Sequence, residues 1–272
     1  MQLDPNQARR APIGVFDSGA GGLSIVAAIR AALPTQAIVY YADTAFAPYG
    51  PRSDQEIFER THFCCSLLLE RGVAALVVAC NTATANAIDE LRAWAPVPVV
   101  GVEPGLKPAA SATRNGIVGV LATRATLMSR RYRELLRRVS EENSEVRFVE
   151  HAAHGWVELV ESGELDTERA RGLVRDAVRA LIDQGADTLV LGCTHYPFLR
   201  KAIEAAAGSA AIIETGPAIA RQLQRRLPQV PGIGSAPATQ LLQLESSGDR
   251  DQFAALAATL LAVADSQRPD SG

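Results

Sequence analysis

The sequence predicts an α/β protein made of two related halves, each built around a buried parallel strand that ends in a cysteine. Residues 71–82 and 184–195 align without a gap at a constant offset of 113. In both segments a glycine precedes a short apolar run, which stops at Cys80 or Cys193. Such a run after a helix-ending glycine is typical of a buried parallel strand, and parallel strands present their chemistry at their carboxyl ends. Both cysteines are therefore expected at a strand end.

A second match links the opening strands of the two halves. Residues 14–18 match residues 119–123 at an offset of 105, so the repeat consists of two βα modules. In this alignment Asp17 has no acidic counterpart, whereas Ser18 corresponds to Thr123. The glycine-rich loop that follows Ser18 fits neither of the phosphate-binding glycine motifs, so a nucleotide site is not expected.

Length and composition limit the possible classes of protein. A chain of 272 residues favours two domains, and 47% hydrophobic with 21% charged residues is close to the globular average. No apolar run approaches the roughly 20 residues of a membrane span, and the polar N-terminus lacks a secretory signal, so we expect a cytoplasmic protein without a membrane partner. A net charge of −3 gives no general attraction to nucleic acid.

Hydrophobic periodicity and turn residues place the other elements. Ser53 and Glu56 predict a capping box at the start of a helix that ends near Arg71, and a further helix is expected to begin at Thr126. The proline-rich stretch 96–108 is the expected crossing between domains. The expected organisation is a flexible leader at 1–11, a first α/β domain of 12–98 plus 213–265, a second α/β domain of 99–212 and a flexible tail at 266–272.

Two clusters outside the repeat have alternative interpretations. The helix after Thr126 carries five arginines between residues 130 and 138, but the glutamates among them favour a solvated helix face over a nucleic-acid site. His151 and His154 lie three residues apart, without cysteine or carboxylate ligands in a recognisable pattern. A metal site is therefore not expected.

Two matched thiols suit the inversion of a stereocentre. A cysteine has a pKa of about 8.5, which a helix N-terminus lowers further, so it can act as a base and, once protonated, as an acid. If the halves face each other across a cleft, Cys80 can remove an α-proton while Cys193 protonates the opposite face. Asp17 is expected to accept a hydrogen bond from Cys80 or from a substrate ammonium, and His195 to assist Cys193. The uncharged donors available for carboxylates are Ser18, Asn81, Thr82 and Thr194.

Five motifs, at residues 14–19, 48–50, 79–82, 191–197 and 248–249, carry a family resemblance that spans nearly the whole chain. They resemble those of glutamate racemase, in the cofactor-independent aspartate/glutamate racemase superfamily. The resemblance implies two pseudo-symmetric Rossmann-like domains with parallel, flavodoxin-like sheets and the active site in the cleft between them. It also implies a homodimer that interconverts L- and D-glutamate without cofactor or metal and supplies D-glutamate for peptidoglycan.

The resemblance also assigns residues. By motif, Cys80 serves one enantiomer and Cys193 the other, and the implied substrate-binding positions are Asp17, Ser18, Pro48, Tyr49, Gly50, Asn81, Thr82, Thr123, Thr126, Thr194 and His195. The chain departs from the family pattern at 46–47 and at 154–163, where His-Gly-Trp-Val-Glu stands in place of a Cys-Pro start. Glu161 keeps an acidic position in that segment and is a further candidate for the site.

Three other functions remain open at this stage. An aspartate racemase or a related two-cysteine isomerase would differ in its side-chain pocket rather than in its chemistry. A hydrolase with Cys193 as nucleophile and His195 as base would form a covalent intermediate and would not depend on Cys80. A regulatory homologue that inhibits DNA gyrase would be a binding protein, and the arginine-rich helix is the one feature that hints at it.

Overall fold

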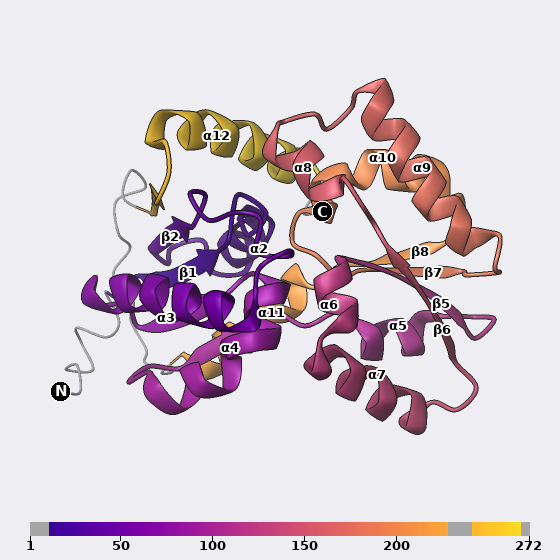
Figure 1. The fold of residues 1–272 in the computed structure, drawn as a ribbon, viewed down its shortest axis with the longest axis horizontal. Coiled ribbons are helices and arrows are strands. Elements are labelled where there is room, and N and C mark those ends of the chain that lie inside the picture. Colours follow the sequence, from indigo (N-terminus) through magenta and orange to yellow (C-terminus); the bar gives the residue numbers. More distant parts are fainter. Residues whose placement is uncertain (1–10, 228–240, 268–272) are drawn as a thin grey trace.

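Two parallel β-sheets form the framework of the protein (Figure 1). The structure is a computed structural model, and it describes residues 11–227 and 241–267. The first sheet has the strand order β4-β3-β1-β2-β9, with β1 at Ile13–Asp17, β2 at Ile38–Ala42, β3 at Ala75–Val78, β4 at Val99–Gly101 and β9 at Leu242–Ser246. The second has the order β6-β5-β7-β8, with β5 at Ile117–Ala122, β6 at Arg147–Ala152, β7 at Thr188–Leu191 and β8 at Ala211–Ile213. The predicted α/β class is confirmed.

Helices cover the sheets on both faces, as alternate residues of β1 show. Ile13 and Val15 belong to one apolar cluster, and Phe16 to another. The helices of the first half are α2 (Leu23–Ala32), α3 (Asp54–Glu70), α4 (Asn81–Trp94), α11 (Gly216–Arg226) and α12 (Arg250–Ser266). Those of the second are α5 (Leu106–Ala112), α6 (Arg124–Met128), α7 (Arg130–Glu142), α8 (Trp156–Glu161), α9 (Glu168–Ile182), η1 (Tyr196–Leu199) and α10 (Arg200–Ala207). Across residues 11–227 and 241–267, none of these helices is long and apolar enough to cross a membrane.

The strand order brings four polar strand ends together. β1 ends at Asp17, and β3 leads through one alanine to Cys80. In the second half β5 leads directly to Thr123, and β7 leads through one glycine to Cys193. Because β1 pairs with β3 and β5 pairs with β7, each half presents two of these positions side by side at the carboxyl edge of its sheet.

The domain boundaries expected from the sequence need correction at both crossings. β4 pairs with β3, so residues 99–101 complete the first sheet and do not open the second domain. β8 pairs with β7, so Ile213 ends the second sheet instead of returning to the first. The proline-rich stretch 96–108 includes β4 and the start of α5, and backbone pairing across the first sheet decides where that sheet ends. The expected leader lies almost wholly outside the described residues, and of the expected tail Ser266 is still helical in α12.

Two strands, β6 and β9, were not anticipated from the sequence. Both lie at an edge of their sheet, where one side of the strand has no partner strand among residues 11–227 and 241–267. Their residues, Arg-Phe-Val-Glu-His-Ala and Leu-Gln-Leu-Glu-Ser, mix apolar and polar positions, and all except Val149 are at least partly exposed. Edge strands need no continuous apolar run, so the signal that marked the central strands is missing here.

Side-chain caps shift one predicted helix and confirm another. The helix expected to begin at Thr126 is two helices, because Thr123 caps α6 and Ser129 ends it and caps α7. Ser53 caps α3, and its reciprocal hydrogen bonds with Glu56 confirm the predicted capping box. The loop after β5 therefore turns into a short helix earlier than periodicity alone indicates.

Thr84 holds α4, the helix capped by Cys80, against the ends of two strands. Its replacement by valine is expected to lower the free energy of unfolding by about 1–3 kcal/mol. The buried Thr84 Oγ1 donates to Val78 O at 3.1 Å and accepts from Val102 N–H at 3.1 Å. Valine has the same shape but leaves both backbone groups unpaired. Urea unfolding of Thr84→Val and of Thr84→Ser, which keeps the hydroxyl, measures the effect; a valine variant as stable as the parent would contradict it.

Candidate active site

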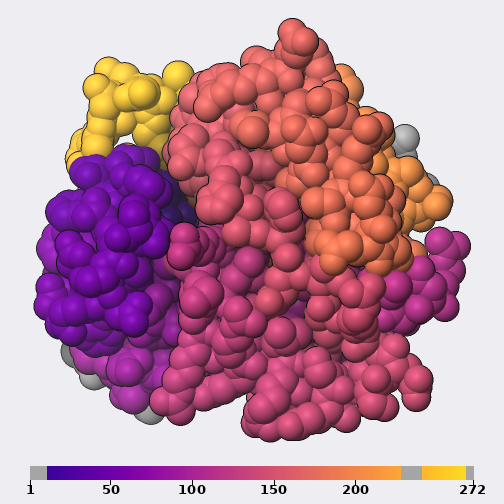
Figure 2. All heavy atoms as spheres, turned by 45° about the vertical axis from the view of Figure 1, so that its right-hand side comes forward, coloured from indigo at the N-terminus to yellow at the C-terminus, as the bar shows by residue number. Residues whose placement is uncertain are grey.

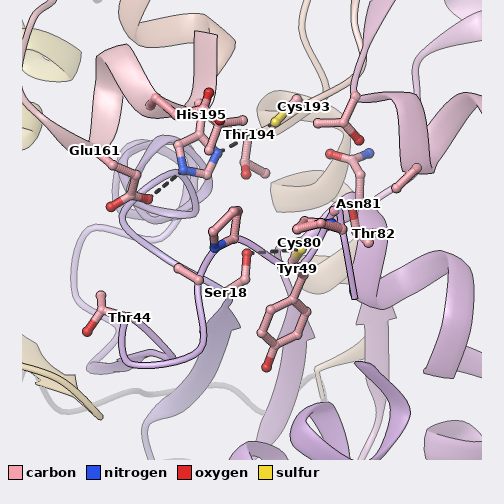
Figure 3. A pocket seen from close by; sticks show the side chains of 18 of the residues that line it. Ser18, Thr44, Tyr49, Cys80, Asn81, Thr82, Glu161, Cys193, Thr194 and His195 are labelled. Atoms are coloured by element: carbon pink, nitrogen blue, oxygen red, sulfur yellow. Dashed lines mark hydrogen bonds and ion pairs between the residues drawn. The ribbon is translucent and has the colours of Figure 1, made fainter. Parts of the chain in front are cut away.

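A pocket of about 810 Å³ lies where the carboxyl edges of the two sheets meet, and both matched cysteines line it. Figure 3 shows Cys80 and Cys193 on opposite sides of this space. The space-filling view shows the indigo first half and the magenta-to-orange second half meeting along a seam (Figure 2). The other predicted site residues that line the pocket are Ser18, Pro48, Tyr49, Gly50, Asn81, Thr82, Thr123, Thr126, Glu161, Thr194 and His195.

Cys80 is held at the start of α4 by neutral groups. Its Sγ accepts a hydrogen bond from Ala83 N–H at 3.4 Å and lies 3.4 Å from Ser18 Oγ. Burial raises the pKa of Cys80 to about 12, and the nearby Asp17 carboxylate adds to the effect. The expected lowering by the helix N-terminus is therefore wrong for this thiol, because the loss of hydration outweighs the N–H donor. With a pKa this high, Cys80 is protonated at neutral pH.

Cys193 has a charged neighbour instead. Its Sγ lies 3.6 Å from His195 Nδ1, and His195 Nε2 lies 2.6 Å from Glu161 Oε1. Burial disfavours a charged imidazole, but the hydrogen bonds and charges of Cys193 and Glu161 outweigh it and raise the pKa of His195 well above its ordinary value. Glu161 also accepts from Ala20 N–H at 2.7 Å. The sequence repeat thus places two thiols in different electrostatic surroundings.

Asp17 lies behind the pocket wall and does not line the pocket. It is fully buried, and its Oδ1 accepts from Ser18 Oγ at 3.2 Å and from Gly19 N–H at 2.9 Å. Its Oδ2 accepts from Thr194 Oγ1 at 3.0 Å, which ties the loops of the two halves together. The expected direct hydrogen bond between Asp17 and Cys80 is replaced by a relay. Ser18 Oγ donates to Asp17 and lies 3.4 Å from Cys80 Sγ, so Ser18 connects the two residues.

Tyr49 lines the pocket, but its hydroxyl is engaged by a residue outside it. The phenol donates to Asp43 Oδ2 at 2.7 Å, and Figure 3 shows the ring extending away from the two sulfurs. Asn81 offers the opposite case. Among the described residues its buried Oδ1 has no hydrogen-bond partner, although the side chain lines the pocket. A buried acceptor without a partner at a pocket wall fits a ligand that donates a proton there.

Comparison with known proteins decides the family. A family model described as Asp/Glu/Hydantoin racemase matches residues 23–223. The chain belongs to this racemase family. It is 47% identical over 244 residues to glutamate racemase of Herpetosiphon aurantiacus, covering 89% of this chain and 95% of that one. It is 46% identical over 258 residues to glutamate racemase of Ectopseudomonas mendocina, covering 94% and 96%.

Solved structures agree with the family assignment. A glutamate racemase isoform from Bacillus anthracis superposes with a TM-score of 0.82 at 32% identity, covering 93% of this chain and 95% of that one. Escherichia coli glutamate racemase, in complex with L-glutamate and the activator UDP-MurNAc-ala, gives a TM-score of 0.74 at 33% identity, covering 87% and 98%. The chain is accordingly an isomerase, a cofactor-independent amino-acid racemase.

Several residues of the racemase pocket were missed from the sequence. The turn after β9 and the first turns of α12 contribute Gly248, Asp249, Gln252, Phe253 and Leu256. Without β9 in the predicted sheet, nothing in the periodicity brought this segment to the cleft, although Gly248-Asp249 carried part of the family resemblance. From the second half the pocket gains Arg124, His154, Glu158 and Ser162.

Gly21 leaves room for the imidazole of His195, and Gly21→Ala is expected to lower the racemase kcat about tenfold. A Cβ built on Gly21 would overlap Nδ1 and its neighbouring ring atoms, so the imidazole has to leave its present position beside Cys193. Racemisation followed by circular dichroism measures the loss. Gly172→Ala on α9 is the control, because the nearest atom to its Cβ lies 3.9 Å away; equal activity of the two variants would contradict the expectation.

Proposed function

We propose that this racemase interconverts L- and D-glutamate by two-base proton transfer at the α-carbon, with Cys80 and Cys193 as the two bases. The observation that carries the proposal is that thiols from matched strand ends line one pocket from opposite sides. Two groups that exchange roles as acid and base can invert a carbon held between them. The names of the relatives support glutamate as the substrate, as does the complex of the Escherichia coli relative with L-glutamate.

The reaction begins at whichever sulfur faces the α-hydrogen. In one direction the Cys193 thiolate takes the α-proton, so the C–H bond breaks, an S–H bond forms and the electron pair stays on the substrate as a carbanion. The Cys80 thiol then gives its proton to the opposite face of the carbon. The imidazolium of His195, held by Glu161, stabilises the negative charge on the first sulfur. The reverse reaction uses the same groups in exchanged states.

Substrate binding supplies a positive charge that favours the thiolate form of Cys80. An ammonium group that donates to Asn81 Oδ1 places a positive charge near a thiol whose pKa burial has raised to about 12. The buried carboxylate of Asp17, which lies behind Ser18 at the pocket wall, favours the same cation. The carboxylates of the substrate are met by hydroxyls of Thr82, Thr123 and Thr126 and by the backbone N–H groups of Tyr49 and Gly50.

The hydrolase alternative has one observation in its favour. Cys193, His195 and Glu161 lie in a row, which is also the order of a cysteine nucleophile, its base and an orienting carboxylate. That reading leaves Cys80 without a task at the opposite wall. The gyrase alternative loses its hint, because Arg130, Arg131, Arg133 and Arg137 form ion pairs with acidic residues of the chain itself.

The test is racemisation of L- and D-glutamate in deuterium oxide, followed by circular dichroism and by mass spectrometry, with aspartate assayed alongside. Inversion of glutamate with one deuterium at the α-carbon supports the proposal. Faster inversion of aspartate would assign the pocket to the shorter substrate. No inversion of either amino acid by the folded protein would overturn the function.

The family resemblance further supports a cytoplasmic homodimer that supplies D-glutamate for peptidoglycan. Sedimentation velocity tests whether the protein is a dimer.

A further inference from the structure

The segment after β2 forms one wall of the pocket and is held from behind. Residues of this segment that line the pocket are Thr44, Ala47, Pro48, Tyr49, Gly50 and Pro51, called here the 44–51 loop. Its first part is tied to the turn after β9, where Thr44 Oγ1 lies 2.5 Å from Ser246 Oγ and Ala45 N–H donates to Ser247 Oγ at 3.0 Å. The second part, residues 47–51, has no such tie to β9 within the described residues.

Two backbone donors in the second part are open. Within the described part of the chain, the N–H groups of Tyr49 and Gly50 donate to no protein acceptor, while Tyr49 O accepts from Arg52 N–H at 3.0 Å. Unpaired N–H groups at a pocket wall are suited to an anionic group of a ligand. Their position depends on what fixes Tyr49.

A buried ion pair fixes Tyr49. Its hydroxyl donates to Asp43 Oδ2 at 2.7 Å, and the Asp43 side chain is fully buried. Arg60 of α3 binds the same carboxylate through both of its oxygens, with Nε 3.0 Å from Oδ2 and Nη2 2.7 Å from Oδ1. Burial disfavours the carboxylate, but these hydrogen bonds outweigh it and keep the pKa of Asp43 below its ordinary value.

Arg60 also contacts the loop itself. Its guanidinium lies over the ring of Phe46, 3.7 Å from the centroid, and 4.8 Å from that of Phe63 on its own helix. Arg60 does not line the pocket, so it reaches a ligand only through the loop. The guanidinium of Arg60 thus connects α3 with Asp43, just before the loop, and with Phe46 inside it.

We propose that Arg60 is a positioning residue for substrate binding: it holds Asp43, Asp43 holds the Tyr49 hydroxyl, and these contacts fix the open N–H donors of Tyr49 and Gly50 at the pocket wall. The inference rests on the proposed function for the identity of the substrate. Within the described residues, the hydrogen bonds of Cys80 and Cys193 involve none of Arg60, Asp43 and Tyr49, so the contacts are expected to act on substrate binding.

Arg60→Gln is the decisive variant. It removes the two-pronged contact, and the KM for glutamate is expected to rise about tenfold or more while kcat stays within about threefold. Tyr49→Phe removes one hydroxyl, keeps the ion pair and is expected to raise KM about threefold. Arg130→Gln is the control, because Arg130 pairs with Glu134 on the exposed face of α7 and does not line the pocket. Its KM is expected to stay within about twofold.

Amide hydrogen exchange of the unliganded proteins separates this inference from the function. Peptides that cover the 44–51 loop are expected to exchange faster in Arg60→Gln and Tyr49→Phe than in the parent, and at the parent's rate in Arg130→Gln. If the parent does not racemise glutamate, the proposed function fails and the exchange data still decide the role of Arg60. Unchanged loop exchange, or an active parent whose KM is matched by both Arg60→Gln and Tyr49→Phe, would overturn the inference.

Discussion

Replacing either Cys80 or Cys193 by serine is expected to lower kcat for racemisation by about 10³- to 10⁴-fold. A serine hydroxyl holds its proton far more tightly than a thiol, so it can neither take the α-proton nor deliver one at neutral pH. Both residues line the pocket, and each stands at its own wall. Because inversion needs both faces of the carbon, the loss is expected to be similar for the two variants. Circular dichroism of L- and D-glutamate measures it.

Deuterium exchange distinguishes the two sulfurs. Each single variant keeps one base, so in deuterium oxide it is expected to exchange the α-proton of one enantiomer only, without inverting it. The control is Cys65→Ala, which removes a fully buried thiol of α3 outside the pocket and is expected to keep the parent's kcat. A Cys80→Ser variant with full activity would refute the two-base mechanism, and it would favour nucleophilic chemistry at Cys193.

The second large effect is expected at His195. His195→Asn removes the cation beside Cys193 Sγ and is expected to lower kcat/KM about 100-fold, and Glu161→Gln less. Since the two enantiomers have equal free energy, kcat/KM has to fall equally in both directions. The asymmetry of the site is expected in isotope effects instead. Proton removal by Cys193 becomes slower, so the α-deuterium isotope effect is expected to grow for one enantiomer only. Equal growth for both would contradict a role confined to Cys193.

The same histidine sets a pH dependence with a defined sign. The pKa of His195 is raised in the folded protein, so its charge stabilises the fold fully below the unfolded pKa, which is about 6.5. That stabilisation is lost as pH rises through the folded pKa. Urea unfolding is expected to show a decline in stability on the alkaline side for the parent that is absent in His195→Asn. A parallel decline in the variant would assign it to another group.

Much of the fold and the placement of the two thiols followed from local sequence. The repeat at residues 71–82 and 184–195 predicted two buried strands that end in Cys80 and Cys193, and β3 and β7 lie there. Central strands are covered on both faces, so their apolar runs are continuous and can be recognised one segment at a time. The motifs around these strand ends then indicated which neighbours line the pocket.

Tertiary structure alone decided how these residues act. Glu161 reaches His195 across 34 positions and Arg60 reaches Asp43 across 17, and Asp17 bonds Thr194 across 177. Contacts of this kind depend on how helices pack on sheets, and no period or motif records them. Burial also reversed the expectation for Cys80, whose pKa rises although the thiol stands at a helix N-terminus. Sequence determined which groups stand at the strand ends; packing determined which are hydrated, charged and paired, because desolvation and hydrogen bonding are set by neighbours distant along the chain.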